Sequence, residues 1–169
     1  MPLAFTEAGI TVEALVRRNC ADGTTTRLAW AWPGGPDARA EVHVKPALVL
    51  LVPGSERERL LADLRALGLT DRPDPFFDLL ELGAHSYGFV LSGRVIEDFE
   101  PEELEEVTRV APDPYAVLVE YENVESAKAL LGRLIRDRTG VVDTNYGELI
   151  EFSEFVDRME AEPDWDWRS

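Results

Sequence analysis

The stretch from Tyr115 to Met159 constrains the fold more than any other part of this chain. It opens with an apolar segment that ends at Tyr121 and is rich in residues that strands favour. Residues 124–138 then repeat apolar side chains at a spacing of three and four, which predicts a half-buried helix. The apolar positions of this helix are Val124, Ala127, Leu131, Leu134 and Ile135.

Residues near both ends of this helix fit its predicted boundaries. Asn123 can cap the first free amides, and Gly140 stands where a left-handed stop is expected. A second strand over residues 141–152 leads through Ser153 into a last short helix. The apolar residues of that helix are Phe155, Val156 and Met159. The stretch therefore predicts a strand–helix–strand–helix unit.

The N-terminal part of the chain predicts more strands. Residues 9–18 and 25–32 alternate apolar and polar side chains, and Val42 and Val44 continue the pattern. Short links between these segments indicate an antiparallel meander. Trp30 and Trp32 share one face of the second segment, where we expect them to cover the core.

The middle of the chain holds a second strand followed by a helix. The strand over residues 47–52 is apolar on both faces, and Ser55 is placed to cap a helix over residues 56–67. This unit repeats the order and pattern of residues 116–135, so two readings are open: two related halves, or two similar units without a common origin. Residues 76–82 then predict a short helix. Residues 87–96 predict a strand interrupted by a hairpin or bulge at Ser92-Gly93.

These elements indicate an α+β fold, with a mostly antiparallel sheet and helices packed on one face. A chain of 169 residues is long enough to form one stable domain. We expect that domain to span residues 1–162, with halves at 1–84 and 85–162, and residues 163–169 to form a C-terminal tail. The only cysteine, Cys20, excludes an intramolecular disulfide. Together with an N-terminus that lacks a basic and then apolar leader, it predicts a cytoplasmic protein.

Charge is the most unusual property of the composition. The formal net charge is −16, and residues 85–169 hold eight basic against twenty-one acidic residues. Such a surface repels nucleic acid and anionic membranes, and it attracts basic proteins. A second interpretation is that the acidity only keeps the protein soluble.

Acidic residues are densest just before and within a helix that Pro101 is placed to begin. Local helix chemistry explains only two or three of them, so the others form either a solvated face or a docking surface for a cationic partner. The predicted contact residues are Glu97, Asp98, Glu100, Glu102, Glu103, Glu105 and Glu106.

Two further clusters are candidates for contact with a partner. Residues 143–148 predict a bend with Asn or Gly in a left-handed conformation, and its candidate contact residues are Asp143, Asn145, Tyr146 and Glu148. Trp165 and Trp167 lie in the C-terminal tail. They are expected to fold back against the body or, in the other reading, to contact a partner.

Patterns for catalysis are mostly missing from the sequence. No phosphate-binding loop, paired helical histidines or Gly-x-Ser-x-Gly motif is present, and His43 lies on a predicted strand where a structural role is expected. The alternative to a binding protein is a small metal-dependent hydrolase or nuclease-like enzyme that uses Asp113, Glu120 and Glu122. The lysine that would complete such a nuclease motif is absent, because Glu122 occupies its place. We therefore predict no cofactor and no metal, and the protein is not expected to be an enzyme.

The capped helix, the segment Gly140-Val141-Val142-Asp143, the bend and the last helix resemble a module of small acidic bacterial proteins. Immunity proteins that neutralise secreted toxins are among them. The resemblance covers about residues 115–158 and implies binding to another protein. The leading hypothesis is a non-enzymatic module that binds a basic partner, in the form of an immunity protein or antitoxin. A structural or regulatory subunit of a larger assembly, using the tryptophans, is a third reading.

Overall fold

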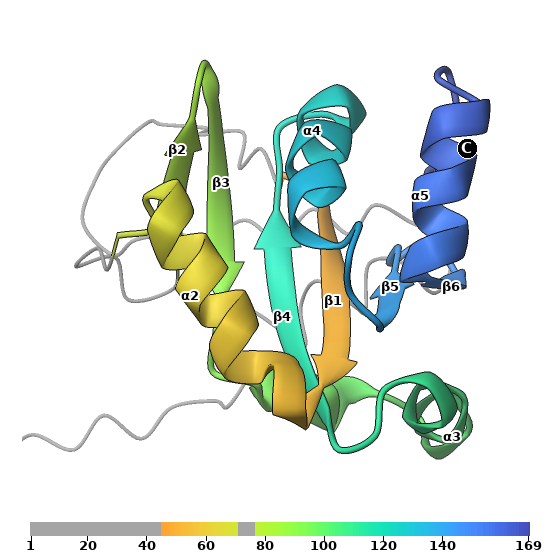
Figure 1. Cartoon of the computed structure of the whole chain (residues 1–169). Helices are drawn as coiled ribbons and strands as arrows, with labels where there is room; N and C mark the ends of the chain where they lie inside the picture. Colours follow the sequence, from red (N-terminus) through yellow and green to blue (C-terminus); the bar gives the residue numbers. More distant parts are fainter. Residues whose placement is uncertain (1–44, 71–76) are drawn as a thin grey trace, which may run out of the picture.

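The computed structural model describes residues 45–70 and 77–169, and its centre is a six-stranded sheet (Figure 1). All neighbouring strands are antiparallel, in the order β2-β3-β4-β1-β5-β6. The strands are β1 (Ala47–Pro53), β2 (Asp78–Leu82), β3 (His85–Val90), β4 (Pro114–Glu120), β5 (Val141–Asp143) and β6 (Leu149–Glu151). The expected N-terminal meander, with Trp30, Trp32, His43 and Cys20, lies outside the described residues.

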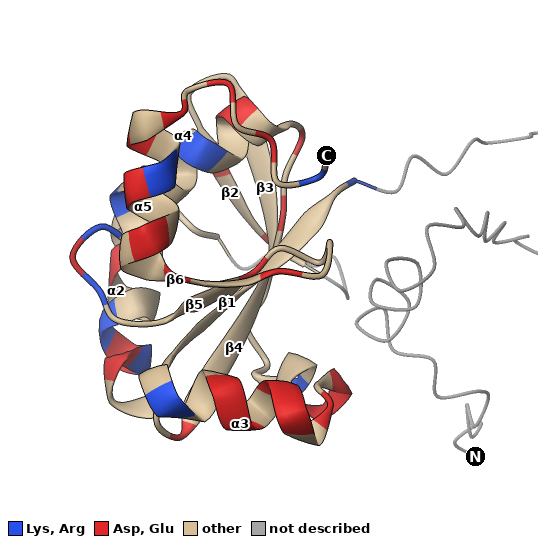
Figure 2. Ribbon diagram, turned by 90° about the vertical axis from the view of Figure 1, so that its right-hand side faces the viewer, with Lys and Arg blue, Asp and Glu red and all other residues tan. Residues whose placement is uncertain are grey.

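Helices cover both faces of the sheet. The helices are α2 (Arg57–Leu67), α3 (Pro101–Val110), α4 (Val124–Leu134) and α5 (Phe152–Ala161), with 3-10 turns η1 (Gly54–Glu56) and η2 (Arg94–Asp98). Helices α2, α4 and α5 lie side by side on one face, whereas α3 lies near one end of the opposite face (Figures 1 and 2). The α+β class and the antiparallel sheet are thus confirmed, and α3 is the helix that departs from the expected single layer.

Strands β1 and β4 form the centre of the sheet and separate two hydrophobic cores. They pair over seven positions, from Ala47 opposite Glu120 to Pro53 opposite Pro114. Leu48, Leu50 and Val52 contact the core under α2, α4 and α5, and the alternate residues of β1 contact the core under α3. Both sides of β1 are buried because both are covered. That explains its continuous apolar sequence.

The two strand–helix units lie next to each other in space. Strand β1 leads into α2 and strand β4 into α4, and the two helices cover the same face of the central pair. A hairpin flanks each side of the pair, but the attachments differ. Strand β4 pairs with the second strand of the β2–β3 hairpin, whereas β1 pairs with the first strand of the β5–β6 hairpin. The two units therefore share the order of strand and helix, but their hairpins are attached to the central pair of strands differently.

The helix boundaries were predicted with mixed success. Asn123 caps α4, because its side chain accepts a hydrogen bond from the Ser126 amide at 2.9 Å. Ser55 does not cap α2, since it lies within η1 and Glu56 occupies the N-cap position. Gly140 is not a left-handed stop, because its φ is not positive. A Cβ at Gly140 would lie 2.5 Å from the Leu51 carbonyl oxygen, so close packing requires glycine there.

Three of the predicted elements have a different form in the structure. The predicted helix over residues 76–82 is strand β2, which pairs with β3 across a two-residue turn that begins at Gly83, φ 63°. The predicted strand 87–96 ends at Val90, and η2 follows it. The predicted strand 141–152 is a hairpin of β5 and β6. None of the helices within residues 45–70 and 77–169 combines the length and apolar composition that a membrane span requires.

Candidate functional site

The acidic residues between Glu97 and Glu106 are held in place by the start of α3. Glu100 is the N-cap, Pro101 occupies the first turn, and the Glu103 carboxylate accepts a hydrogen bond from the Glu100 amide at 2.9 Å. Val107 is fully buried against the sheet, and Leu104 is half-buried beside the same core. This anchoring turns the opposite side of the helix toward solvent.

Most of the predicted acidic contact residues are exposed. The exposed carboxylates are Glu97, Glu100, Glu102, Glu105 and Glu106, while Asp98 and Glu103 are half-buried. Viewed onto the side where α3, the β5–β6 hairpin and α5 are in front, α3 is the most uniformly acidic helix, whereas α4 and α5 carry both signs (Figure 2). We name these five exposed carboxylates, of η2, the N-cap Glu100 and α3, the α3 acidic face.

Only part of this charge is neutralised by neighbouring residues. Glu105 pairs with Arg109 at 2.8 Å, and Glu97 pairs with Arg94 at 3.6 Å. Within the described ranges, Glu102 and Glu106 form no ion pair. They are one turn apart and project from the same stripe of the helix, so their like charges reinforce one another. The α3 acidic face therefore keeps a net negative field.

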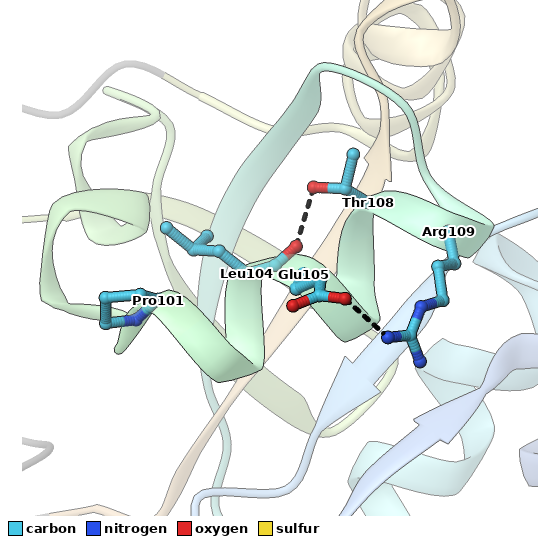
Figure 3. Close-up of a pocket in the computed structure, with 5 residues that line it drawn as sticks. All are labelled: Pro101, Leu104, Glu105, Thr108 and Arg109. Carbon is cyan, nitrogen blue, oxygen red and sulfur yellow. Dashed lines mark hydrogen bonds and ion pairs between the residues drawn. The ribbon is translucent and has the colours of Figure 1, made fainter.

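A shallow hollow lies along α3, and sequence reasoning missed it. It is open, has a volume of about 430 Å³, and is lined by Pro101, Leu104, Glu105, Thr108 and Arg109 (Figure 3). These residues follow a spacing of three and four, and that spacing was the available signal. The Thr108 hydroxyl donates to the Leu104 carbonyl oxygen at 2.6 Å, so its hydrogen-bonding capacity is already partly used within the helix.

The predicted bend joins β5 to β6 and is fixed by hydrogen bonds to β1 and within the bend. Asn145 has φ 60° and Gly147 has φ 91°, which confirms the expected left-handed residues. The Asn145 side chain donates to the Ala47 carbonyl oxygen at 3.0 Å, and Asp143 Oδ1 accepts from the Asn145 amide at 2.8 Å. Asp143 and Asn145 are buried, so they act in the structure of the bend and not as surface contacts. Glu148 and Tyr146 are exposed, and Tyr146 is 44% accessible.

The two tail tryptophans are packed against the body, which was the first of the two interpretations of the tail; the other was contact with a partner. Trp165 stacks edge-on against Phe155 with ring centroids 5.0 Å apart, and the guanidinium carbon of Arg158 lies 4.3 Å from the centroid of the Trp165 ring. Trp167 Nε1 donates to the Tyr121 hydroxyl at 3.1 Å. Both indoles are buried, so they offer no exposed aromatic surface for a partner. Their inclusion among the contact residues is corrected accordingly.

Tyr121 and Asp166 are among the ionisable groups near the tail with shifted pKa values. Burial raises the pKa of Tyr121 to about 12, although the hydrogen bond from Trp167 opposes this shift. Hydrogen bonding from Arg168 lowers the pKa of Asp166 to about 2, so this carboxylate stays ionised at neutral pH. The first shift follows from burial of Tyr121 in the core, and the second follows from pairing within the tail.

In the alternative enzyme site, Asp113 and Glu120 lie at opposite ends of β4. Asp113 precedes β4 and Glu120 ends it, and a strand of seven residues spans about 23 Å. Glu122 instead lies 3.4 Å from His85 Nδ1. Over the described part of the chain, no group of three or more His, Cys, Asp or Glu side chains is arranged to hold a metal ion. The predicted trio therefore does not share one metal site.

Comparisons of the chain with protein-family models, curated proteins and solved structures found no match. The class is accordingly defined by the structure alone. The described residues form an α+β structure with an antiparallel sheet and an acidic helix, α3, on the face opposite α2, α4 and α5.

Proposed function

We propose that this protein is a non-enzymatic binding module that captures a basic protein through the α3 acidic face. The observation that supports it best is the pair of exposed glutamates, Glu102 and Glu106, that form no ion pair within the described residues. Charges without an ion pair on a rigid helix can bind a partner with little loss of conformational entropy. An immunity protein or antitoxin is the concrete form of this proposal.

Electrostatic attraction sets the expected kinetics. A field from the acidic C-terminal half speeds the encounter with a cationic protein, and exposed pairs on the rim contribute mostly to the association rate. Salt screens such pairs over a Debye length of about 10 Å at 0.1 M. Affinity for the partner should therefore fall as salt rises.

The direct test is capture from a lysate of the source cell by the wild-type protein and by a Glu102→Lys/Glu106→Lys variant. The control is Glu154→Lys/Asp157→Lys, which makes the same charge change at exposed positions of α5. The proposal expects a basic protein to be retained by wild type and control, lost from the α3 variant, and lost from all three in high salt. Equal retention by the α3 variant and the control would overturn it.

A further inference from the structure

The hollow on α3 combines an apolar floor with acidic edges. Pro101 and Leu104 supply carbon surface, and Thr108 has already used its hydroxyl as a donor within the helix. Glu105 lies within the hollow, while Glu102 and Glu106 follow in the neighbouring stripe of the same helix. Such a surface can receive a side chain that is apolar along its stem and cationic at its end.

One such side chain is already present. Arg109 lines the hollow and donates from its guanidinium to Glu105 Oε1 at 2.8 Å, as the close-up shows (Figure 3). Both side chains are more than two-thirds exposed, at 69% and 73%. The pair is therefore weak, because water solvates both ends and the two long side chains must be ordered to form it. An incoming cation can replace Arg109 at the Glu105 carboxylate without a large loss.

We infer that the hollow is the docking point for a cationic amphipathic segment of the basic partner. When this segment is not bound, Arg109 pairs with the Glu105 carboxylate. This inference rests on the proposed function and adds the chemistry of the contact. Charge complementarity selects the occupant, since α3 carries four glutamates against one arginine. An apolar side chain of the segment covers Leu104, and a Lys or Arg pairs with Glu105.

The test uses two synthetic probes on the full chain: a leucine–lysine peptide of helical periodicity and an oligolysine of the same charge. Two pairs of variants are compared. Arg109→Gln is matched by Arg59→Gln, which removes an arginine of α2 that is 57% exposed and pairs at i,i+3 with Glu56, the N-cap residue of that helix. Thr108→Lys, which places a cation in the hollow, is matched by Ala161→Lys at the exposed end of α5.

The inference expects the leucine–lysine peptide to bind more tightly than oligolysine. Arg109→Gln should strengthen binding of the leucine–lysine peptide by about twofold to fivefold, the range of an exposed ion pair, whereas Arg59→Gln should change it little. Thr108→Lys should weaken it more than Ala161→Lys does. Circular dichroism of each variant shows whether the fold is retained.

Two other results would count against specific parts of the account. If both peptides bind equally and the members of each variant pair behave alike, the hollow is not the docking point, while the acidic face still binds cations. If neither peptide binds at low salt, the hollow and the proposed function both fail.

Discussion

At the scale of single residues, Arg138 fastens the end of α4 to α2. Its side chain is only 3% exposed and donates to the Glu56 carboxylate at 3.0 Å, to the Asp63 carboxylate and to the Leu134 carbonyl oxygen at 2.8 Å. The planar guanidinium suits this arrangement because it offers several donors in fixed directions. The carboxylates remain partly exposed, so water can solvate them when the arginine is removed.

Replacing Arg138 with Met should lower the free energy of unfolding by about 1–3 kcal/mol, less than for a fully buried pair because both acids reach solvent. Arg136→Met is the matched control, since Arg136 pairs with Glu160 where both side chains are 53% exposed. We expect it to cost at most about 0.5 kcal/mol. Urea unfolding of both variants measures the difference, and equal losses would contradict the role given to Arg138.

Tyr121 makes the stability depend on pH in the alkaline range. Its pKa is about 12 in the folded protein against 10.0 for an unperturbed tyrosine. Between these values the unfolded state releases a proton that the folded state keeps, so the free energy of unfolding falls as pH rises. Below pH 10 both states are protonated and this group has no effect.

Tyr121→Phe should therefore flatten the decline of stability between about pH 10 and pH 12 by an amount on the order of 2 kcal/mol. Tyr87 and Tyr115 also have raised pKa values, through burial, and they contribute to the decline in both proteins. The readout is the difference between the two urea-unfolding series across this pH range. Parallel declines would show that Tyr121 ionises equally in both states.

At the scale of elements, sequence patterns predicted helices and buried strands well where one period dominated. The α4 spacing and the Asn123 cap predicted that helix, and the Pro101 start predicted α3. Strand β2 was missed because a short apolar run fits either a helix or a strand. The deciding signal was Gly83, which supplies the positive φ of a two-residue hairpin turn. The sequence patterns did not predict which strand of each hairpin pairs with the central strands, because that pairing depends on contacts between segments far apart in the sequence.

The candidate site was predicted in part, for a similar reason. The exposed acids of α3 follow from helical periodicity, since Leu104 and Val107 must turn inward. The burial of Asp143 and Asn145 could not be predicted, because it depends on β1, to which Asn145 is bonded across almost a hundred residues of sequence. Tertiary contacts of this kind decide which polar residues of a bend remain on the surface.

The two glycines around the end of α4 should respond oppositely to alanine. A Cβ at Gly140 would lie 2.5 Å from both the Leu51 carbonyl oxygen and the Phe152 ring, whereas a Cβ at Gly132 meets no atom within 4 Å. Gly140→Ala should therefore lower the free energy of unfolding by about 2 kcal/mol or more. Gly132→Ala should raise it by about 0.5–1 kcal/mol because it favours the helix. Thermal melting of both variants tests the contrast, and a neutral Gly140→Ala would show that the strand–helix junction relaxes freely.

At the scale of the whole molecule, the C-terminal tail completes the larger core. Trp165 and Trp167 pack on Phe155 and Tyr121, and Lys128 donates to the Pro163 carbonyl oxygen. These contacts join the tail to Tyr121, which directly follows β4, and to α4 and α5. The last seven residues are therefore part of the folded body and not an appendage.

Deleting residues 163–169 should lower the free energy of unfolding by about 3–5 kcal/mol, the range for removing large aromatic side chains from a core. Deleting only Arg168 and Ser169, which are exposed, should cost at most about 1 kcal/mol. Urea unfolding of the two truncated chains gives the comparison. A small loss on deletion from Pro163 would mean that the tail packs without supporting the core.

The charge of the molecule is distributed so that α3 carries an excess of acid on the face opposite the other helices. Among the described strands, β6 lies at the edge of the sheet. It is short and ends in Glu151, and such features discourage pairing between sheets of different molecules. The acidic surface is therefore better suited to a basic protein than to a second copy of this chain.

The measurement that tests this account most directly is the association rate with the captured partner as a function of ionic strength. Wild type, Glu102→Lys/Glu106→Lys and the control Glu154→Lys/Asp157→Lys would be compared. We expect the α3 variant to associate at least about tenfold more slowly at low salt, with a flatter salt dependence and a dissociation rate changed by less than about threefold. The same association rate and salt dependence in both variants would contradict the account, because the position of the charge on α3 would then be irrelevant.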